Sequence, residues 1–222
     1  MVHVSSISDP LEWLSHQSVY RDVLAQMPLL LEAASGTTSE ADAAARHIRA
    51  ALALGEAWSA MERSDIWPRL VMVSPTNYVI VHELRMQLES SLEELRQMQT
   101  AVRDWLDDRR EYHHLLTLFI QFEDDFESNL SGFARLGLPS MREAFTDASW
   151  NQLQADVCQR IDPDLRMLVL GLVLATKSPP AQSRLLAALS PSLKAEWASA
   201  GVAAFNRHQG LMAKILLQAG AA

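Results

Sequence analysis

The residues best suited to metal chemistry are Glu111 and His114, which stand three positions apart. On a helix this spacing puts both side chains on one face, one turn apart. A Glu-x-x-His pair supplies half of the ligands of a carboxylate-bridged two-metal site in a helical bundle. The sequence holds no second Glu-x-x-His pair, so further ligands would have to be carboxylates such as Glu32, Glu56 or Glu62. Glu111 and His114 are therefore candidate metal ligands, and the alternative is that both are solvated.

A second charged cluster consists of Glu123, Asp124 and Asp125. If the chain reverses ahead of it, this cluster comes to lie near Glu93 and Glu94. Like charges brought together in this way favour a divalent cation or a positively charged partner. We therefore expect these five carboxylates to bind a basic partner, with a solvated acidic face as the alternative.

Motifs of covalent catalysis and of cofactor binding are missing from the sequence. There is no Gly-x-Ser-x-Gly, no Gly-rich phosphate loop and no pair of cysteines that could hold zinc. The single cysteine, Cys158, excludes an intramolecular disulfide and fits a reducing compartment. We predict no cofactor and favour a protein without enzymatic activity.

The composition narrows the classes of partner. The 222 residues include 27 acidic and 19 basic side chains, for a formal net charge of −8, and 49% are hydrophobic. This acidity argues against nucleic acid and against an anionic membrane surface. The longest apolar run, 167–175, is far shorter than the roughly 20 residues that span a bilayer. We expect no nucleic-acid partner, no membrane insertion and a cytoplasmic location, and the excess of Arg over Lys indicates a GC-rich bacterial gene.

The clearest local patterns in the sequence are those of helix N-termini. Ser or Asp followed by Pro suits an N-cap and the first helical position, and this pair occurs at 9–10, 74–75, 162–163, 178–179 and 190–191. Alternating strand patterns and hairpin turns are nearly missing. The sequence therefore predicts an all-α fold with a linker over 67–75 and helices over about 10–26, 39–64, 140–160, 163–176, 179–189 and 191–218.

The central element is a segment without Gly or Pro, 76–131, which is too long for one ordinary globular helix. The charged stretch 107–110 marks a reversal, and both halves carry heptads. The seams of the first half are Val81, Leu88, Leu95, Val102 and Leu84, Ser91, Met98, Trp105; those of the second are Tyr112, Phe119, Phe126, Phe133 and Leu115, Phe122, Asn129, Leu136. This pattern predicts a helical bundle built on a long antiparallel hairpin over about 76–136, with shorter N- and C-terminal helices packed around it.

Residues 1–222 are expected to form a single helical domain, in which 140–222 can form a C-terminal helical subdomain. The last helix carries an apolar stripe that includes Leu211 and Ile215. Such a stripe either docks on the chain's own core or contacts another chain, including a second copy in a homo-oligomer. We name Leu211 and Ile215 as candidate partner-binding residues.

These features favour a non-enzymatic bacterial protein-interaction module: an adaptor, chaperone, immunity protein or regulatory subunit. Its partner would be another protein with a basic or apolar surface. One alternative is a helical-bundle enzyme that uses a metal or cofactor at Glu111 and His114. Another is a ligand-sensing domain with an aromatic pocket around Phe119, Phe122 and Phe126.

Overall fold

The computed structural model describes residues 15–33 and 38–220; the side chains of 126–138 and of a few single residues lie outside this description. All the regular elements within these ranges are helical, which confirms the all-α prediction. The α-helices are α2 (Ser15–Ala33), α3 (Thr38–Met61), α4 (Trp67–Val73), α5 (Asn77–Asp107), α6 (Tyr112–Ala144), α7 (Asp147–Arg160), α8 (Pro163–Ala175), α9 (Pro179–Ala188), α10 (Pro191–Glu196) and α11 (Val202–Ala219). Two π-helical turns, η1 (Glu62–Ile66) and η3 (Trp197–Gly201), and one 3-10 turn, η2 (Arg109–Glu111), connect some of them.

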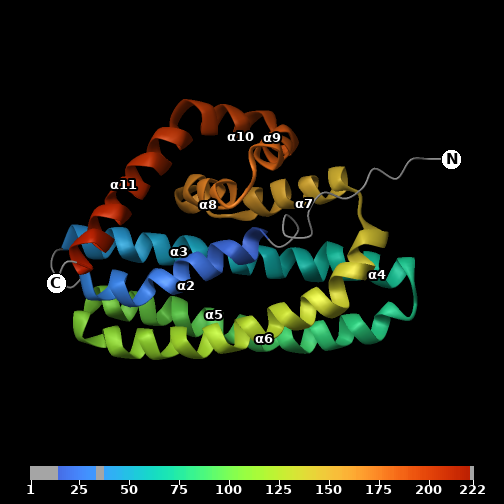
Figure 1. The fold of residues 1–222 in the computed structure, drawn as a ribbon, viewed down its shortest axis with the longest axis horizontal. Helices are drawn as coiled ribbons and strands as arrows, with labels where there is room; N and C mark the ends of the chain where they lie inside the picture. Colours follow the sequence, from blue (N-terminus) through green and yellow to red (C-terminus); the bar gives the residue numbers. More distant parts are fainter. Residues whose placement is uncertain (1–14, 34–37, 221–222) are drawn as a thin grey trace.

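The helices lie in layers (Figure 1). The α5–α6 hairpin forms one layer, α2 and α3 form the next, and α7 to α10 lie on the far side of α3. The last helix, α11, returns across the stack to contact α8, α2 and α3. One cluster of buried hydrophobic residues extends from Val19 on α2 to Ile215 on α11. The proposed C-terminal subdomain stays a prediction.

The long hairpin is present where the heptads predict it. α5 ends at Asp107 and α6 begins at Tyr112, so the chain reverses at the charged stretch. The predicted seam residues that are buried are Val81, Leu84, Leu95, Met98, Val102, Trp105, Leu115, Phe119 and Phe122. Ser91 is half-buried and donates to the Gln87 carbonyl at 3.3 Å. The side chains of Phe126, Asn129, Phe133 and Leu136 lie outside the described residues.

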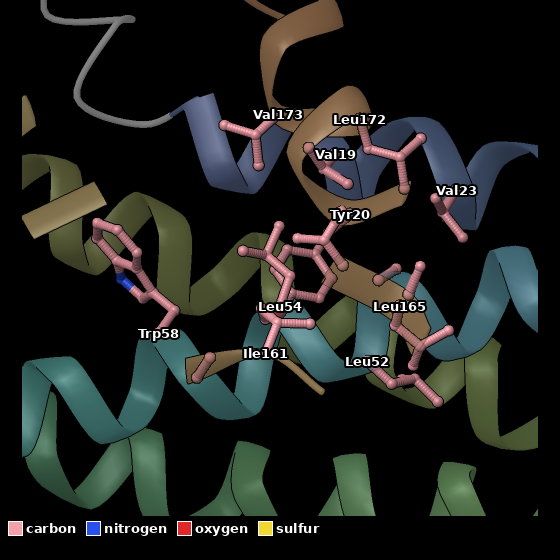
Figure 2. Packing of buried hydrophobic residues seen from close by; sticks show 14 of the residues in the cluster. Val19, Tyr20, Val23, Leu52, Leu54, Trp58, Ile161, Leu165, Leu172 and Val173 are labelled. Atoms are coloured by element: carbon pink, nitrogen blue, oxygen red, sulfur yellow. The ribbon is translucent and has the colours of Figure 1, made fainter. Parts of the chain in front are cut away.

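Helix α3 occupies the middle of the stack because small residues let its neighbours approach it closely. Fifteen of its 24 residues are buried, and many of these are alanine. A Cβ atom at Gly55 would overlap the hydroxyl group of Tyr20 on α2. Figure 2 shows Tyr20 beside Leu54, and Trp58 farther along α3. Trp58 meets Trp150 of α7 edge to face, with ring centroids 5.4 Å apart, so aromatic contacts also tie α3 to the far layer.

Several of the helix boundaries predicted from the sequence were wrong. The predicted linker over 67–75 is mostly helical, because α4 follows η1 directly and its residues Trp67 and Leu70 are buried. Pro28 lies inside α2 rather than ending it. The predicted 191–218 helix is divided by η3.

Gly137 and Pro139 do not end α6, which continues to Ala144. Beyond Pro139 the helix is held by burial of Ser140 and Met141. The next helix, α7, begins at Asp147, and its N-cap is Thr146, whose hydroxyl accepts from the Ser149 backbone N–H at 3.2 Å. Tertiary burial therefore outweighs the local preference for a break at Pro139.

Several of the Ser-Pro and Asp-Pro pairs do start helices. Asp162, Ser178 and Ser190 are the N-caps of α8, α9 and α10. In contrast, Ser74 ends α4 and Pro75 lies in the short turn before α5. None of the described helices combines the length and apolar character needed to cross a bilayer.

Candidate protein-interaction surface

Five of the nine large apolar side chains that are exposed in the described part of the chain belong to the segment 72–86, where α4 meets α5. We name this group the corner patch: Met72 (83% exposed), Val73 (46%), Tyr78 (65%), Val79 (62%) and Met86 (57%). Met is a flexible residue that is common on protein-binding surfaces. Large apolar side chains that are exposed near one another mark a candidate contact surface.

A buried asparagine fixes the corner that carries the patch. The Asn77 Nδ2 group donates to the Leu70 carbonyl of α4 at 2.8 Å, and the Ser140 hydroxyl of α6 donates to Asn77 Oδ1 at 3.1 Å. Asn77 and Ser140 are both buried. Because one side chain links three helices, the patch is presented on a rigid part of the fold.

The periodicity of α5 explains why the patch faces solvent. Val79 and Met86 are seven residues apart and lie on one helix face, away from the seam that contains Leu84 and Leu95. The Tyr78 ring stacks on that of His82 one turn later, with 9° between the planes and 6.4 Å between centroids. The first turns of α5 therefore expose Tyr78, Val79 and Met86, with the charged side chain of Glu83 between the last two.

The same face becomes polar and acidic toward the hairpin turn. A groove of about 360 Å³ lies there, and its lining includes the acidic Glu93 and Asp104, the basic Arg96, and His114 of α6. The exposed side chains of α5 and of residues 112–125 include eight acidic and three basic residues. Two of the basic residues are paired on the surface: Arg85 with Glu89 at 3.1 Å and Arg96 with Glu93 at 3.4 Å. The face is left with an excess of negative charge.

The hairpin register brings Glu94 and Asp125 together, as the reversal predicts. Burial, followed by the hydrogen bond and the charge of Asp125, raises the pKa of Glu94 to about 7. Glu94 Oε2 is buried with no hydrogen-bond donor, which also favours the protonated carboxyl group. We name these two residues the acid pair. Glu93, Glu123 and Asp124 are exposed, and their contact with a partner stays a prediction.

Glu111 and His114 lie at the turn end of the hairpin, and both are exposed. His114 lines the acidic groove, whereas Glu111 ends η2. Among the described residues there is no group of three or more His, Cys, Asp or Glu side chains placed to hold a metal. The structure therefore does not assemble further ligands around this pair within the described chain.

Of the other carboxylates considered as ligands, Glu62 lies in the core. It begins η1, is 9% exposed, and accepts from Trp58 Nε1 at 2.9 Å. Burial raises the pKa of Glu62 to about 7, with the Trp58 hydrogen bond and the Arg63 charge acting against it. Glu62 is thus a buried hydrogen-bond acceptor between packed helices, and it lies far along the chain from Glu111.

The apolar stripe of α11 docks on the chain's own core. Ile215 is fully buried, Met212 is 2% exposed, and Leu211 packs partly buried against the same cluster. The prediction that Ile215 contacts a partner is corrected accordingly, since it has no exposed surface. Leu217, at 74% exposed, is the apolar residue of α11 that faces solvent.

Two further predicted groups lie in the interior. Phe119 and Phe122 are buried in the hairpin seam, and Phe122 meets Tyr20 of α2 at 6.3 Å between centroids. Phe126 is outside the described side chains. Cys158 is buried, and burial raises the pKa of its thiol to about 12, which makes it a poor nucleophile.

The corner patch was not identified in the sequence analysis, although its signal was present. Val79 and Met86 repeat at heptad spacing outside both seams, where polar residues are usual.

Comparison of the chain with protein-family models, with curated proteins and with solved structures gave no significant match.

Proposed function

We propose that this chain is a non-enzymatic interaction module of the cytoplasm that binds a basic, amphipathic segment of another protein along the outward face of α5. The observation that carries the proposal is the corner patch, whose residues Met72, Tyr78 and Val79 are each more than 60% exposed. An adaptor, chaperone, immunity protein or regulatory subunit would use such a surface.

The charges along α5 indicate what kind of segment would bind there. Val79 and Met86 of α5 are followed along the helix by the groove that Glu93 and Asp104 line. The 31 residues of α5 extend over roughly 46 Å, enough to hold several turns of a partner helix. A segment with apolar side chains at one end and Lys or Arg at the other matches this surface.

Site-specific photo-crosslinking tests the proposal. A photoreactive amino acid replaces Val79 in one variant and Ile120, an exposed apolar residue of α6 outside the corner patch, in the matched control. In the native host, position 79 is expected to link to a protein segment that carries apolar and basic residues, and position 120 is not. The linked segment is identified by mass spectrometry.

Binding of that segment as a synthetic peptide then measures the surface directly. Met86→Lys is expected to weaken binding by about tenfold or more, and higher salt is expected to weaken it further. Ile120→Lys is expected to leave binding unchanged. Links from position 79 to a second copy of this chain, to lipid or to an acidic segment would overturn the proposal.

A further inference from the structure

A pair of histidines joins α3 to α11 on the opposite side of α3 from the hairpin. His47 is 3% exposed, and its Nδ1 lies 3.1 Å from Nε2 of His208. The ring planes are 20° apart and the centroids are 5.3 Å apart, which is the separation expected for two rings that meet edge to edge. One imidazole therefore donates and the other accepts. We name these residues the histidine pair.

Both rings are uncharged at neutral pH. Burial, followed by the neighbouring His208, lowers the pKa of His47 to about 4. Burial and the charge of Arg46 lower the pKa of His208 to about 4. Arg46 itself donates to the Asp164 carbonyl at 2.8 Å.

A cavity of about 300 Å³ opens beside His47, between α2, α3, α8 and α11. Its apolar wall includes Val19 and Val23 of α2, Leu172 of α8 and Phe205 of α11. Figure 2 shows Val19, Val23 and Leu172 close to one another where α2 meets α8. This volume is at the lower end for small-molecule sites and suits a compound of about ten non-hydrogen atoms.

The polar groups of the cavity select for positive charge. Asp22 of α2 is the one lining side chain with a formal charge at neutral pH. Gln26 and Gln209 line the same cavity and offer amide oxygens, and His47 lies beside them as a neutral ring. A carboxylate with several oxygen acceptors favours a ligand that carries N–H donors and positive charge.

We propose that this cavity binds a small organic ammonium compound with an apolar body. Its ammonium group pairs with Asp22, and its apolar body lies against Leu172 and Phe205. This site is separate from the surface of α5 and does not depend on the function proposed above.

Three probes of similar size and different charge test the proposal on the full chain: 2-phenylethylamine, 2-phenylethanol and 3-phenylpropanoate. Ring resonances of His47 and His208 are followed by NMR at neutral pH. The amine is expected to shift both sets of resonances saturably, whereas the alcohol and the acid do not at the same concentration. Equal binding of all three probes, or tighter binding of the acid, would overturn the proposal.

Variants of exposed lining residues locate the bound amine. Asp22→Asn is expected to weaken amine binding by about tenfold or more, and Asp42→Asn, an exposed carboxylate of α3 that does not line the cavity, leaves it unchanged. Ala175→Leu places a larger side chain in the cavity and is expected to abolish binding. Amine binding that is unaffected by both Asp22→Asn and Ala175→Leu contradicts the site.

Discussion

The acid pair and the histidine pair are built alike but hold protons in opposite ways. Glu94 and Asp125 join α5 to α6, and His47 and His208 join α3 to α11 across 161 positions of the chain. Burial favours the uncharged form of Glu94, which is protonated, and of both imidazoles, which are deprotonated. We name the contact of α11 with α3 at the histidine pair the α11 joint. The stability that Glu94 contributes to the hairpin and the stability that the histidines contribute to the α11 joint therefore change in opposite directions with pH.

The largest effect is expected from removing the buried member of the histidine pair. His47→Ala leaves a cavity between α3 and α11 and leaves His208 without its partner at 3.1 Å. We expect a loss of about 3 to 4 kcal/mol in the free energy of unfolding. Urea unfolding measures it, with His114→Ala as the control, because His114 is exposed. An equal loss in the two variants would contradict a structural role for the histidine pair.

Acid provides a second test of the same joint. The folded chain keeps His47 neutral down to about pH 4, whereas the unfolded chain takes up a proton near 6.5. The stability that neutral His47 contributes is complete above pH 6.5 and is lost as the pH falls toward 4, by up to about 3 kcal/mol.

The wild type and His47→Ala are compared by urea unfolding at a series of pH values, which isolates the pH-dependent stability that His47 contributes. Glu62 and Glu94 act in the opposite direction, because their contributions are present below pH 4.5 and are lost as the pH rises toward 7. They are common to both proteins, so the stability difference is expected to shrink as the pH falls below 6.5. A difference that stays constant would show that His47 does not titrate in this way.

A steric change at the α11 joint separates packing from protonation. A Cβ atom at Gly171 of α8 would overlap the ring of Phe205 on α11. Gly171→Ala is expected to cost about 2 kcal/mol at every pH, because no titratable group is altered. Gly210→Ala is the control, since its Cβ meets nothing within 4 Å, and it is expected to be neutral or stabilising. Unfolding at pH 5 and pH 8 checks both.

The hairpin could be predicted from the sequence because its signals are local. Heptad spacing marks the seam, and the charged stretch 107–110 marks the reversal. The same register placed Glu94 beside Asp125. The histidine pair could not be found this way, because 161 positions separate its members and only the packing of α11 on α3 brings them together.

The helix boundaries that were predicted wrongly are those at which tertiary burial outweighs the local preference of the residues for a helix end or a linker. Met141 and Ser140 hold α6 together beyond Pro139, and Trp67 and Leu70 make a helix of the expected linker. The docking of Ile215 also depends on the arrangement of α2, α3 and α8. Periodicity showed that α11 has an apolar face, but it could not show which surface covers that face.

The smallest effect is expected at the acid pair, because Glu94 is half-buried and solvent screens its charge. Glu94→Gln replaces the carboxyl group by an uncharged group of similar shape. Since the pKa of Glu94 is about 7, the variant is expected to be more stable than the wild type at pH 8, by less than about 1 kcal/mol, and equal to it at pH 5. Urea unfolding at the two pH values measures the gain.

Glu89→Gln is the matched control for this substitution. Glu89 is exposed on the same helix and pairs with Arg85 at 3.1 Å, so its replacement is expected to give no gain at pH 8 and a small loss instead. A gain for Glu94→Gln that is the same at pH 5 and pH 8 would mean that packing, rather than the ionisation of Glu94, causes the effect. In that case the hairpin would lack the pH response that distinguishes it from the α11 joint.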